Sequence, residues 1–455
     1  MTNPAATEPS RWPQILASAI LLTGFALMMA VNLPGHLEFD SIRQLLEGRS
    51  GVYSNWHPPV MSWLLGIADN VEPGAPAFVV LEATMTFGGI LALVWLVEWP
   101  SWFVVPAAAI AVALPQLFLF PAIVWKDMLL AAACLAGFAF LAHAAARWDR
   151  PAVRMALLAG AAIFTALAVL TRQNGAVVLP CAAVALGFVA AKQGNVRVGI
   201  RHAVGFFFAT ALLALGANAA LQLRASKALG PIEQLEDLQL YDIAGMLSRR
   251  PELKLSVLEQ ESPKLASRLR IVAPRLYTPV GHDRLTDDPQ IRSHIISSVA
   301  VVARQWRDLI LANPLTYLAV RARDFSWLFF SQHPRECLPY AVGVIGPVAD
   351  LKAAKLTFRY DARDRWLDEH YAAPLVATPV FSHPVFAAAG LVCLVLLLLR
   401  RRPADLAIAG LLIAALLYTA SYFVIAISCQ YRYLYVIDLS AIGASLYLLA
   451  DMRRY

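Results

Sequence analysis

Long apolar runs alternate with polar segments along the chain. Most of the runs approach the ~20 residues that an α-helix needs to cross a hydrocarbon core of ~30 Å. This pattern predicts an all-α polytopic membrane protein with about ten transmembrane helices. The runs lie approximately at residues 14–33, 77–97, 102–120, 128–146, 155–171, 175–191, 203–222, 376–399, 404–428 and 433–450.

Basic residues cluster in alternate polar segments, and this sets the expected orientation. Because short cytoplasmic loops are enriched in Lys and Arg, we expect these segments and both termini in the cytoplasm. No small-residue cleavage site follows the first run, which is therefore expected to remain as a signal anchor. The basic residues concerned are Arg11, Arg147, Arg150, Arg154, Lys192, Arg197, Arg201, Arg400, Arg401, Arg402, Arg453 and Arg454.

The chain is expected to contain three domains. Residues 1–222 form an N-terminal transmembrane module of about seven spans, with a prominent loop at 34–76. Residues 223–375 form an extracytoplasmic helical domain, and residues 376–455 a C-terminal transmembrane module of about three spans. Within the outer domain, amphipathic stretches predict helices at 232–247, 291–311 and 315–330.

The composition supports a membrane protein and argues against a nucleic-acid-binding one. Of 455 residues, 59% are hydrophobic and only 15% are charged, with a mean hydropathy of +0.59. The net charge of +7 comes from loop residues and not from a stripe of basic and aromatic residues. Four of the five cysteines lie in or beside apolar runs, and no CxxC spacing occurs. We therefore expect neither a disulfide framework nor a zinc site.

The first outer loop carries the leading candidate for acid–base chemistry, Asp40. It precedes a short helical pattern that stops at Gly48, so Asp40 is expected to be the N-cap of that helix. This structural role also keeps the carboxylate ionised, and an ionised carboxylate at the membrane surface can accept a proton. Glu38 lies two residues earlier, on the same face of an extended segment, and is the second candidate.

His57 follows in the same loop and precedes two prolines that stiffen the turn. A lone histidine is more often structural than catalytic, but His57 remains a candidate for substrate binding. The apolar stretch 60–67 is too short to span a bilayer. We expect it to lie along the interface, with Trp56 and Trp63 at headgroup depth.

Three basic residues lie at the outer ends of predicted spans: Lys126 at the start of a span, Arg172 in a tight turn, and Arg432 at the start of the last span. The positions of the two arginines oppose the charge rule. Helix pairing would account for the arginines, and an interfacial anchor would account for Lys126 with its neighbour Trp125. The alternative is that all three bind a phosphate. Their neighbours are candidates for substrate binding: Asp127, Asn174 (which also suits the turn itself) and Tyr433.

Together these motifs resemble bacterial membrane glycosyltransferases of the GT-C class. The matching motifs are the loop-one Asp, His-Pro-Pro at 57–59, Lys-Asp at 126–127, Arg-Gln-Asn-Gly at 172–175, Arg-Tyr at 432–433 and Leu-Tyr-Asp-Ile-Ala-Gly at 240–245. In layout the chain is similar to the aminoarabinose and protein O-mannosyl transferases. The resemblance implies a multi-pass protein of the bacterial inner membrane. It would transfer a sugar from a polyprenyl-phosphate carrier to a glycan, lipid or protein acceptor of the cell envelope, on the outer face.

Carried over to this sequence, the resemblance implies a catalytic Asp40, with Glu38 in reserve, and donor-phosphate contacts from Lys126, Arg172 and Arg432. Some family members have two adjacent acids in the first loop. Here Glu38 and Asp40 are separated, so the sequence points to neither a metal nor another cofactor. It identifies neither the sugar nor the acceptor.

The expected chemistry needs only one carboxylate. A sugar phosphate has a stable leaving group, so the proton to be moved is the one on the acceptor hydroxyl. Asp40 would accept it as the hydroxyl attacks the anomeric carbon with inversion, and the basic residues would stabilise the departing lipid phosphate.

Two other functions remain open. A lipid-linked polysaccharide polymerase or ligase would also use outer arginines. A transporter or flippase of lipid-linked sugars would place charged or broken helices near the middle of the membrane, whereas most polar residues here lie at one end of the spans.

Overall fold

The part of the chain that the computed structural model describes is helical, and its β-structure is limited to isolated bridges. The described residues are 10–54, 56–223, 231–295, 299–331 and 333–452, without the side chains of 231–234, 293–295 and 299. Within these ranges the prediction of an all-α chain is confirmed.

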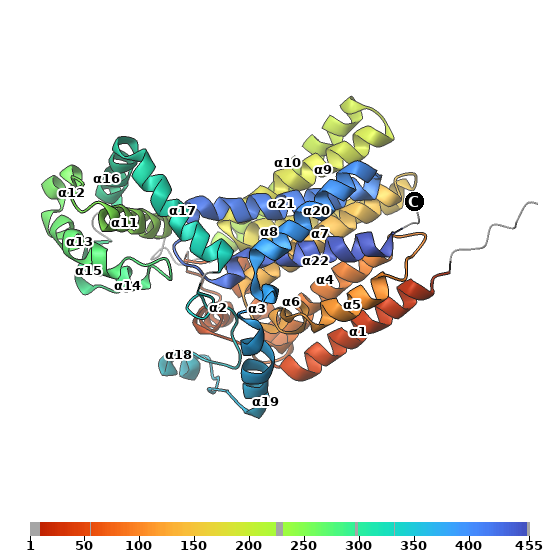
Figure 1. Cartoon of the computed structure of the whole chain (residues 1–455), viewed down its shortest axis with the longest axis horizontal. Helices are drawn as coiled ribbons and strands as arrows, with labels where there is room; N and C mark the ends of the chain where they lie inside the picture. Colours follow the sequence, from red (N-terminus) through yellow and green to blue (C-terminus); the bar gives the residue numbers. More distant parts are fainter. Residues whose placement is uncertain (1–9, 55, 224–230, 296–298, 332, 453–455) are drawn as a thin grey trace, which may run out of the picture.

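Nine helices in the described ranges are long and apolar enough to cross a membrane. They lie side by side in one bundle, with the start of α1 and the C-terminal helix end at the same end of that bundle (Figure 1). The prediction of a multi-pass membrane protein is confirmed. The spans are α1 (Trp12–Asn32), α4 (Pro76–Val94), α7 (Lys126–Ala146), α8 (Pro151–Thr171), η2 with α9 (Gln173–Val177, Val178–Gln193), α10 (Val196–Gln222), α20 (His383–Arg400), α21 (Pro403–Ile425) and η6 with α22 (Tyr431–Leu434, Tyr435–Ala450).

Two predicted spans differ from straight helices. The run at 102–120 forms a pair of helical segments bent by 72°, made of α5 (Val104–Ala113), α6 (Pro115–Phe118) and η1 (Phe120–Ala122). Pro115 explains the break, because proline has no N–H and clashes with the preceding turn. The run at 376–399 also starts late. Two short turns, η4 (Ala373–Leu375) and η5 (Pro379–Phe381), precede α20.

The two most buried spans, α7 and α22, form the centre of the bundle. The α7 helix packs against α4, α8, α21 and α22. It is rich in Ala and Gly, which let neighbouring helix backbones approach closely. Lys126 starts α7 and Arg432 lies in the first turn of η6, so two of the predicted site residues are anchored on the best-packed elements.

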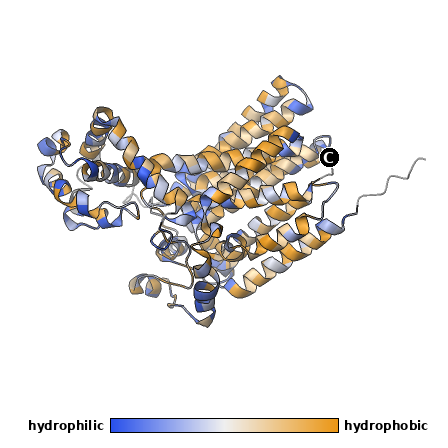
Figure 2. Cartoon of the chain, in the orientation of Figure 1, coloured by the Kyte–Doolittle hydropathy of each residue, from blue (hydrophilic) through white to orange (hydrophobic). Residues whose placement is uncertain are grey.

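The outer helices form a second domain with its own hydrophobic core, which includes Leu240, Tyr241, Leu269 and Val302. Figure 2 shows the contrast between the largely hydrophobic bundle and these mixed helices. The predicted helices at 232–247 and 315–330 are confirmed as α11 and α17. The stretch 291–311 forms α15 and α16, on either side of residues 296–298, which lie outside the described ranges. The helices are α11 (Pro231–Arg249), α12 (Ser256–Glu261), α13 (Pro263–Leu276), α14 (Asp283–Thr286), α15 (Pro289–Ile295), α16 (Val299–Ala312) and α17 (Pro314–Phe330).

Residues 333–364, named here the strap, pack against the bundle and not against the outer core. The strap lies beside the first outer loop: Leu37 N–H donates to the carbonyl of Gly343, and Ile345 N–H donates to the carbonyl of Leu37, both at 2.9 Å. The strap contains α18 (Val348–Ala353) and the start of α19 (Ala362–Arg365), which continues into η3 (Trp366–Ala372).

A disulfide joins Cys337 of the strap to Cys429 in the loop after α21. The expectation of no disulfide was therefore wrong for this pair. The two cysteines are 92 residues apart, and Cys429 follows an apolar run, so no local spacing revealed the bond. The other three cysteines are free and buried.

A buried ion pair between Asp242 of α11 and Arg321 of α17 connects the outer domain to the bundle. Both side chains are fully buried. Trp306 Nε1–H donates to Asp242 at 2.7 Å, and Arg321 donates to the carbonyl of Ala426, just beyond α21, at 2.7 Å. Burial raises the pKa of Asp242 to about 6, against the opposing effect of Arg321. Asp242 of the 240–245 motif is thus linked through Arg321 to the junction between the outer domain and the bundle.

Asp242→Asn should destabilise the outer domain, because it leaves the buried Arg321 guanidinium without a counter-charge. Loss of one partner of a buried pair costs about 3 kcal/mol. Hydrogen exchange of the α11 amides in the full chain measures this loss as reduced protection. The matched control is Glu261→Gln, which removes an exposed pair with Arg304 and should cost below about 1 kcal/mol. Equal protection in both variants would contradict the prediction.

Candidate functional site

His36 fixes the start of the first outer loop. Its side chain is fully buried, and Nδ1 accepts the N–H of Gly343 at 2.9 Å. The other ring nitrogen therefore carries the hydrogen and donates to Asn32 Oδ1 at 2.9 Å. Burial, with the nearby charge of Arg359, lowers the pKa of His36 to about 3. The ring is neutral at ordinary pH and acts as a fixed link between α1, the loop and the strap.

The helix that follows, α2 (Phe39–Ser50), corrects two predictions. Its N-cap is Glu38, and Asp40 lies in its first turn. It also continues past Gly48 and ends at Gly51, whose φ of 67° terminates the helix. Gly48 instead allows close contact with α3 (Pro59–Val71): a Cβ at Gly48 would lie 2.7 Å from the backbone nitrogen of Gly66.

Arg432 lies at the centre of the predicted site, with only 4% of its side chain exposed. Its NH2 group donates to Asp40 Oδ2 at 2.7 Å and its NH1 group donates to Glu38 Oε1 at 3.3 Å. Its Nε donates to Gln430 at 2.7 Å, and the guanidinium lies 4.9 Å from the ring centre of Trp125. The two acidic candidates and one basic candidate are thus brought into direct contact.

Asp127 joins Arg432 to the second arginine. It forms an ion pair with Arg172 and lies 3.8 Å from Arg432 Nε. The Arg172 guanidinium lies 4.7 Å from the ring centre of Tyr433, which lies beside Arg432 as well. Asp127 is buried. In this structure it orders two arginines and offers no open surface to a substrate.

Lys126 and His57 approach Asp40 from the other side. Lys126 Nζ donates to His57 Nδ1 at 2.7 Å, because an ammonium group can only donate. His57 Nε2 then carries the hydrogen and faces Asp40 Oδ1 at 3.6 Å, an electrostatic contact longer than a normal hydrogen bond. Burial and the charge of Lys126 lower the pKa of His57, so its ring is neutral.

Asn174 does not join this cluster. Its side chain donates to Ser421 at 3.0 Å and links η2 to α21. All other predicted site residues meet at one end of the bundle.

Trp125 belongs to the site, although the sequence indicated an interfacial anchor. Only 1% of Trp125 is exposed, and its Nε1–H donates to Glu38 at 3.1 Å. Gln430 was also missed. The one signal in the sequence that Trp125 belongs to the site was its position directly before Lys126. Residues next to each other at the start of a central helix share the same surroundings.

The two carboxylates differ in protonation behaviour. Burial alone would raise the pKa of Asp40, but the His57 N–H and the Arg432 charge hold it well below its usual range. Burial raises the pKa of Glu38, and the charge of Asp40 adds to this, against the effect of Arg432. Asp40 is therefore the stronger candidate for an ionised group that can accept a proton.

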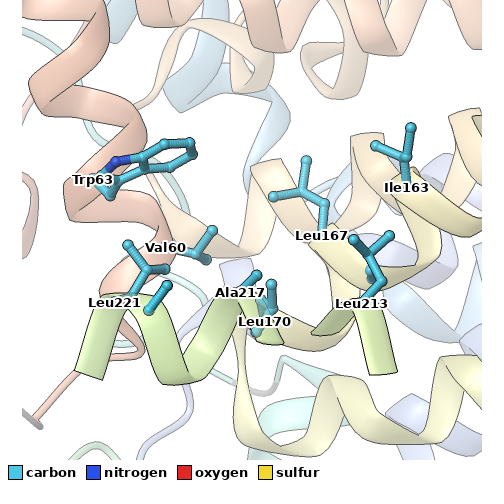
Figure 3. Close-up of a pocket in the computed structure, with 10 residues that line it drawn as sticks. Val60, Trp63, Ile163, Leu167, Leu170, Leu213, Ala217 and Leu221 are labelled. Atoms are coloured by element: carbon cyan, nitrogen blue, oxygen red, sulfur yellow. The ribbon is translucent and has the colours of Figure 1, made fainter. Parts of the chain in front are cut away.

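An apolar groove of about 440 Å³ lies between α3, α8 and α10, and its lining contains none of the charged residues of the cluster. Figure 3 shows its walls, with Val60 and Trp63 from α3, Leu167 from α8 and Leu213 from α10. Val60 follows His57 by three positions in sequence, and another lining residue, Leu170, precedes Arg172 by two. Trp63 is 40% exposed. The lining therefore includes residues a few positions along the chain from His57 and Arg172, at the outer end of the bundle.

Within the described ranges, no three His, Cys, Asp or Glu side chains are arranged to hold a metal ion. The carboxylates of Glu38 and Asp40 instead share the Arg432 guanidinium.

Comparison with known proteins finds no matching family model and no matching curated protein. Solved structures do match. The oligosaccharyltransferase AglB from Archaeoglobus fulgidus, in complex with an inhibitory peptide and a dolichol-phosphate, is 16% identical with a TM-score of 0.42, over 96% of this chain and 50% of that one. ArnT from Cupriavidus metallidurans is 12% identical with a TM-score of 0.32, over 95% and 76%. The chain thus spans about half the length of AglB. At these scores the function must be inferred from the chain's own residues.

Arg432→Gln should lower the melting temperature of the purified protein more at pH 8 than at pH 5. Burial already raises the pKa of Glu38, and the variant loses the guanidinium charge that opposes this rise. Ionisation of Glu38 in the folded protein then costs more free energy, so the variant loses further stability as the pH rises above the unfolded-state pKa of this carboxyl. At pH 8 the loss should be about 3 kcal/mol. Melting curves of both proteins from pH 5 to 8 provide the measurement, and a difference that widens on acidification would contradict it.

Proposed function

We propose that this protein is a membrane glycosyltransferase that moves a sugar from a polyprenyl-phosphate carrier to an acceptor at the extracytoplasmic face. The observation that carries the proposal is the contact of Asp40 with Arg432 on one side and, through His57, with Lys126 on the other. A proton acceptor and cations for a phosphate thus lie together, and an apolar groove lined by Val60 and Leu170 offers a surface for an isoprenoid chain at the same end of the bundle. These are the parts that such a donor needs.

Asp40 is the proposed general base. It is ionised, it is one of the more exposed members of the cluster at 24%, and it lies in the first turn of α2. The acceptor oxygen forms a bond to the anomeric carbon and its proton passes to Asp40. The bond from that carbon to the phosphate oxygen breaks, and polyprenyl phosphate leaves. Attack opposite the phosphate inverts the anomeric centre.

Lys126 and Arg432 are the proposed contacts for the donor phosphate, with Arg172 behind them. Lys126 makes one side-chain hydrogen bond within the described part of the chain, to His57, so its ammonium has further N–H donors. The first turns of α2 and α7 also meet here, and helix N-termini favour anions. A phosphate that binds Arg432 would compete with Asp40 for the guanidinium and free the carboxylate to accept a proton.

The orientation rests on two observations at opposite ends of the bundle. The Cys337–Cys429 disulfide lies beside the cluster, and disulfides persist in oxidising compartments. Basic residues such as Arg150 and Arg402 lie in loops at the other end, as cytoplasmic loops do. We therefore place the cluster on the outer face of a bacterial inner membrane, with both termini in the cytoplasm.

Asp40→Asn should reduce turnover about a hundredfold or more, because it removes the base, while Glu38 remains as a counter-charge for Arg432. The assay gives the purified full chain a panel of polyprenyl-phosphate sugars with candidate acceptors and follows release of the lipid phosphate. The matched control is Asp69→Asn, a carboxylate at the end of α3 that binds Arg49 and not the cluster.

Full turnover by the Asp40→Asn variant would remove Asp40 from the mechanism. Movement of the intact lipid across a vesicle membrane, without a new glycosidic bond, would favour a flippase and overturn the proposal. Repeated addition of whole glycan units to one acceptor would favour a polymerase or ligase.

A further inference from the structure

The strap contacts the chain three residues before each partner of the Asp40–Arg432 ion pair. On one side it forms a bridge with Leu37, three residues before Asp40. On the other side Cys337 is bonded to Cys429, three residues before Arg432. One segment therefore holds the backbone on both sides of the pair.

The loop that carries Arg432 has little regular structure of its own. The α21 helix ends at Ile425 and η6 begins at Tyr431, so residues 426–430 connect two spans without a helix. The strap adds a second contact beside the disulfide, since Tyr431 N–H donates to the carbonyl of Cys337 at 3.0 Å. A long arginine side chain has many rotamers. When its backbone is fixed, the guanidinium can reach fewer positions.

We propose that the Cys337–Cys429 disulfide is a positioning element that holds Arg432 against Asp40 and thereby sets the affinity of the site for a phosphate-bearing lipid. The inference deepens the proposed function and rests on it for the identity of the ligand. Among the described residues, neither cysteine lines the groove or forms a hydrogen bond with Glu38 or Asp40. Their effect passes through the backbone of Cys429 to Arg432.

Reduction provides a test on protein that has already folded. Dithiothreitol donates two electrons and two protons to the disulfide, which yields two thiols, and is itself oxidised to its cyclic disulfide. The readout is the rate at which phenylglyoxal modifies Arg432, measured by peptide mass spectrometry with the exposed Arg150, at the opposite end of the bundle, as the internal reference. This readout requires neither substrate nor turnover.

Because Arg432 is nearly buried in the oxidised protein, release of its loop should raise the rate of modification roughly tenfold relative to Arg150. Cys337→Ser and Cys429→Ser should each reproduce the effect without reductant, and the double variant should add nothing further. Cys393→Ser, which changes a free cysteine in α20, should behave as wild type. Unchanged modification after reduction and in both single variants would overturn the inference, whether or not the protein proves to be a transferase.

The transfer assay then separates positioning from general stability. The Cys337→Ser variant should raise the KM for the lipid-linked donor about tenfold and leave kcat within about twofold, the pattern of lost binding. In an Arg432→Lys background the same substitution should have no further effect on KM, because its target is already altered. A lower melting temperature with an unchanged KM would show that the disulfide only stabilises the fold.

Discussion

A single nearly buried guanidinium organises the candidate site. Arg432 contacts Glu38, Asp40 and the neighbourhood of Asp127 at once, so three segments from distant parts of the chain depend on its charge. Burial of the Arg432 cation without a counter-charge would cost free energy, and so would burial of each carboxylate without a cation. Acidic and basic side chains alternate through the cluster. Equal numbers of negative and positive groups therefore lie together, and the net charge of the cluster stays balanced.

The same arrangement explains why the supporting elements are rigid. The α7 and α22 helices are the best-packed spans, and they carry Asp127 and the Arg432 segment respectively. The neutral His36 links the first loop to α1 and the strap. The strap and the outer domain then contact the loop after α21, through Cys337 and Arg321. Each element that carries part of the cluster is therefore held by contacts with a second element.

The sequence predicted the spans and most of the cluster because both depend on local signals. Apolar runs of fixed length mark helices, and Asp40, Lys126 and Arg432 stand out as charged residues beside them. The N-cap was misplaced by two residues, since Glu38 and Asp40 are chemically alike and only the contact of Gly48 with α3 shows where the helix lies. The disulfide and the strap depend on pairing between segments far apart in sequence, and no periodicity records such contacts. Trp125 was misinterpreted because a tryptophan beside a lysine is equally typical of a lipid interface.

The groove between α3, α8 and α10 has a consequence for how any ligand reaches the cluster. Its lining includes Ile163 and Leu213, which are 56% and 44% exposed on two of the apolar helices, so in a membrane the groove would open sideways toward the lipid. A molecule that enters this way is already dissolved in the membrane and searches in two dimensions. Occupancy would then follow the mole fraction of that molecule in the leaflet and not its amount per volume of water. The lipid composition of the membrane would thus determine how often the groove is occupied.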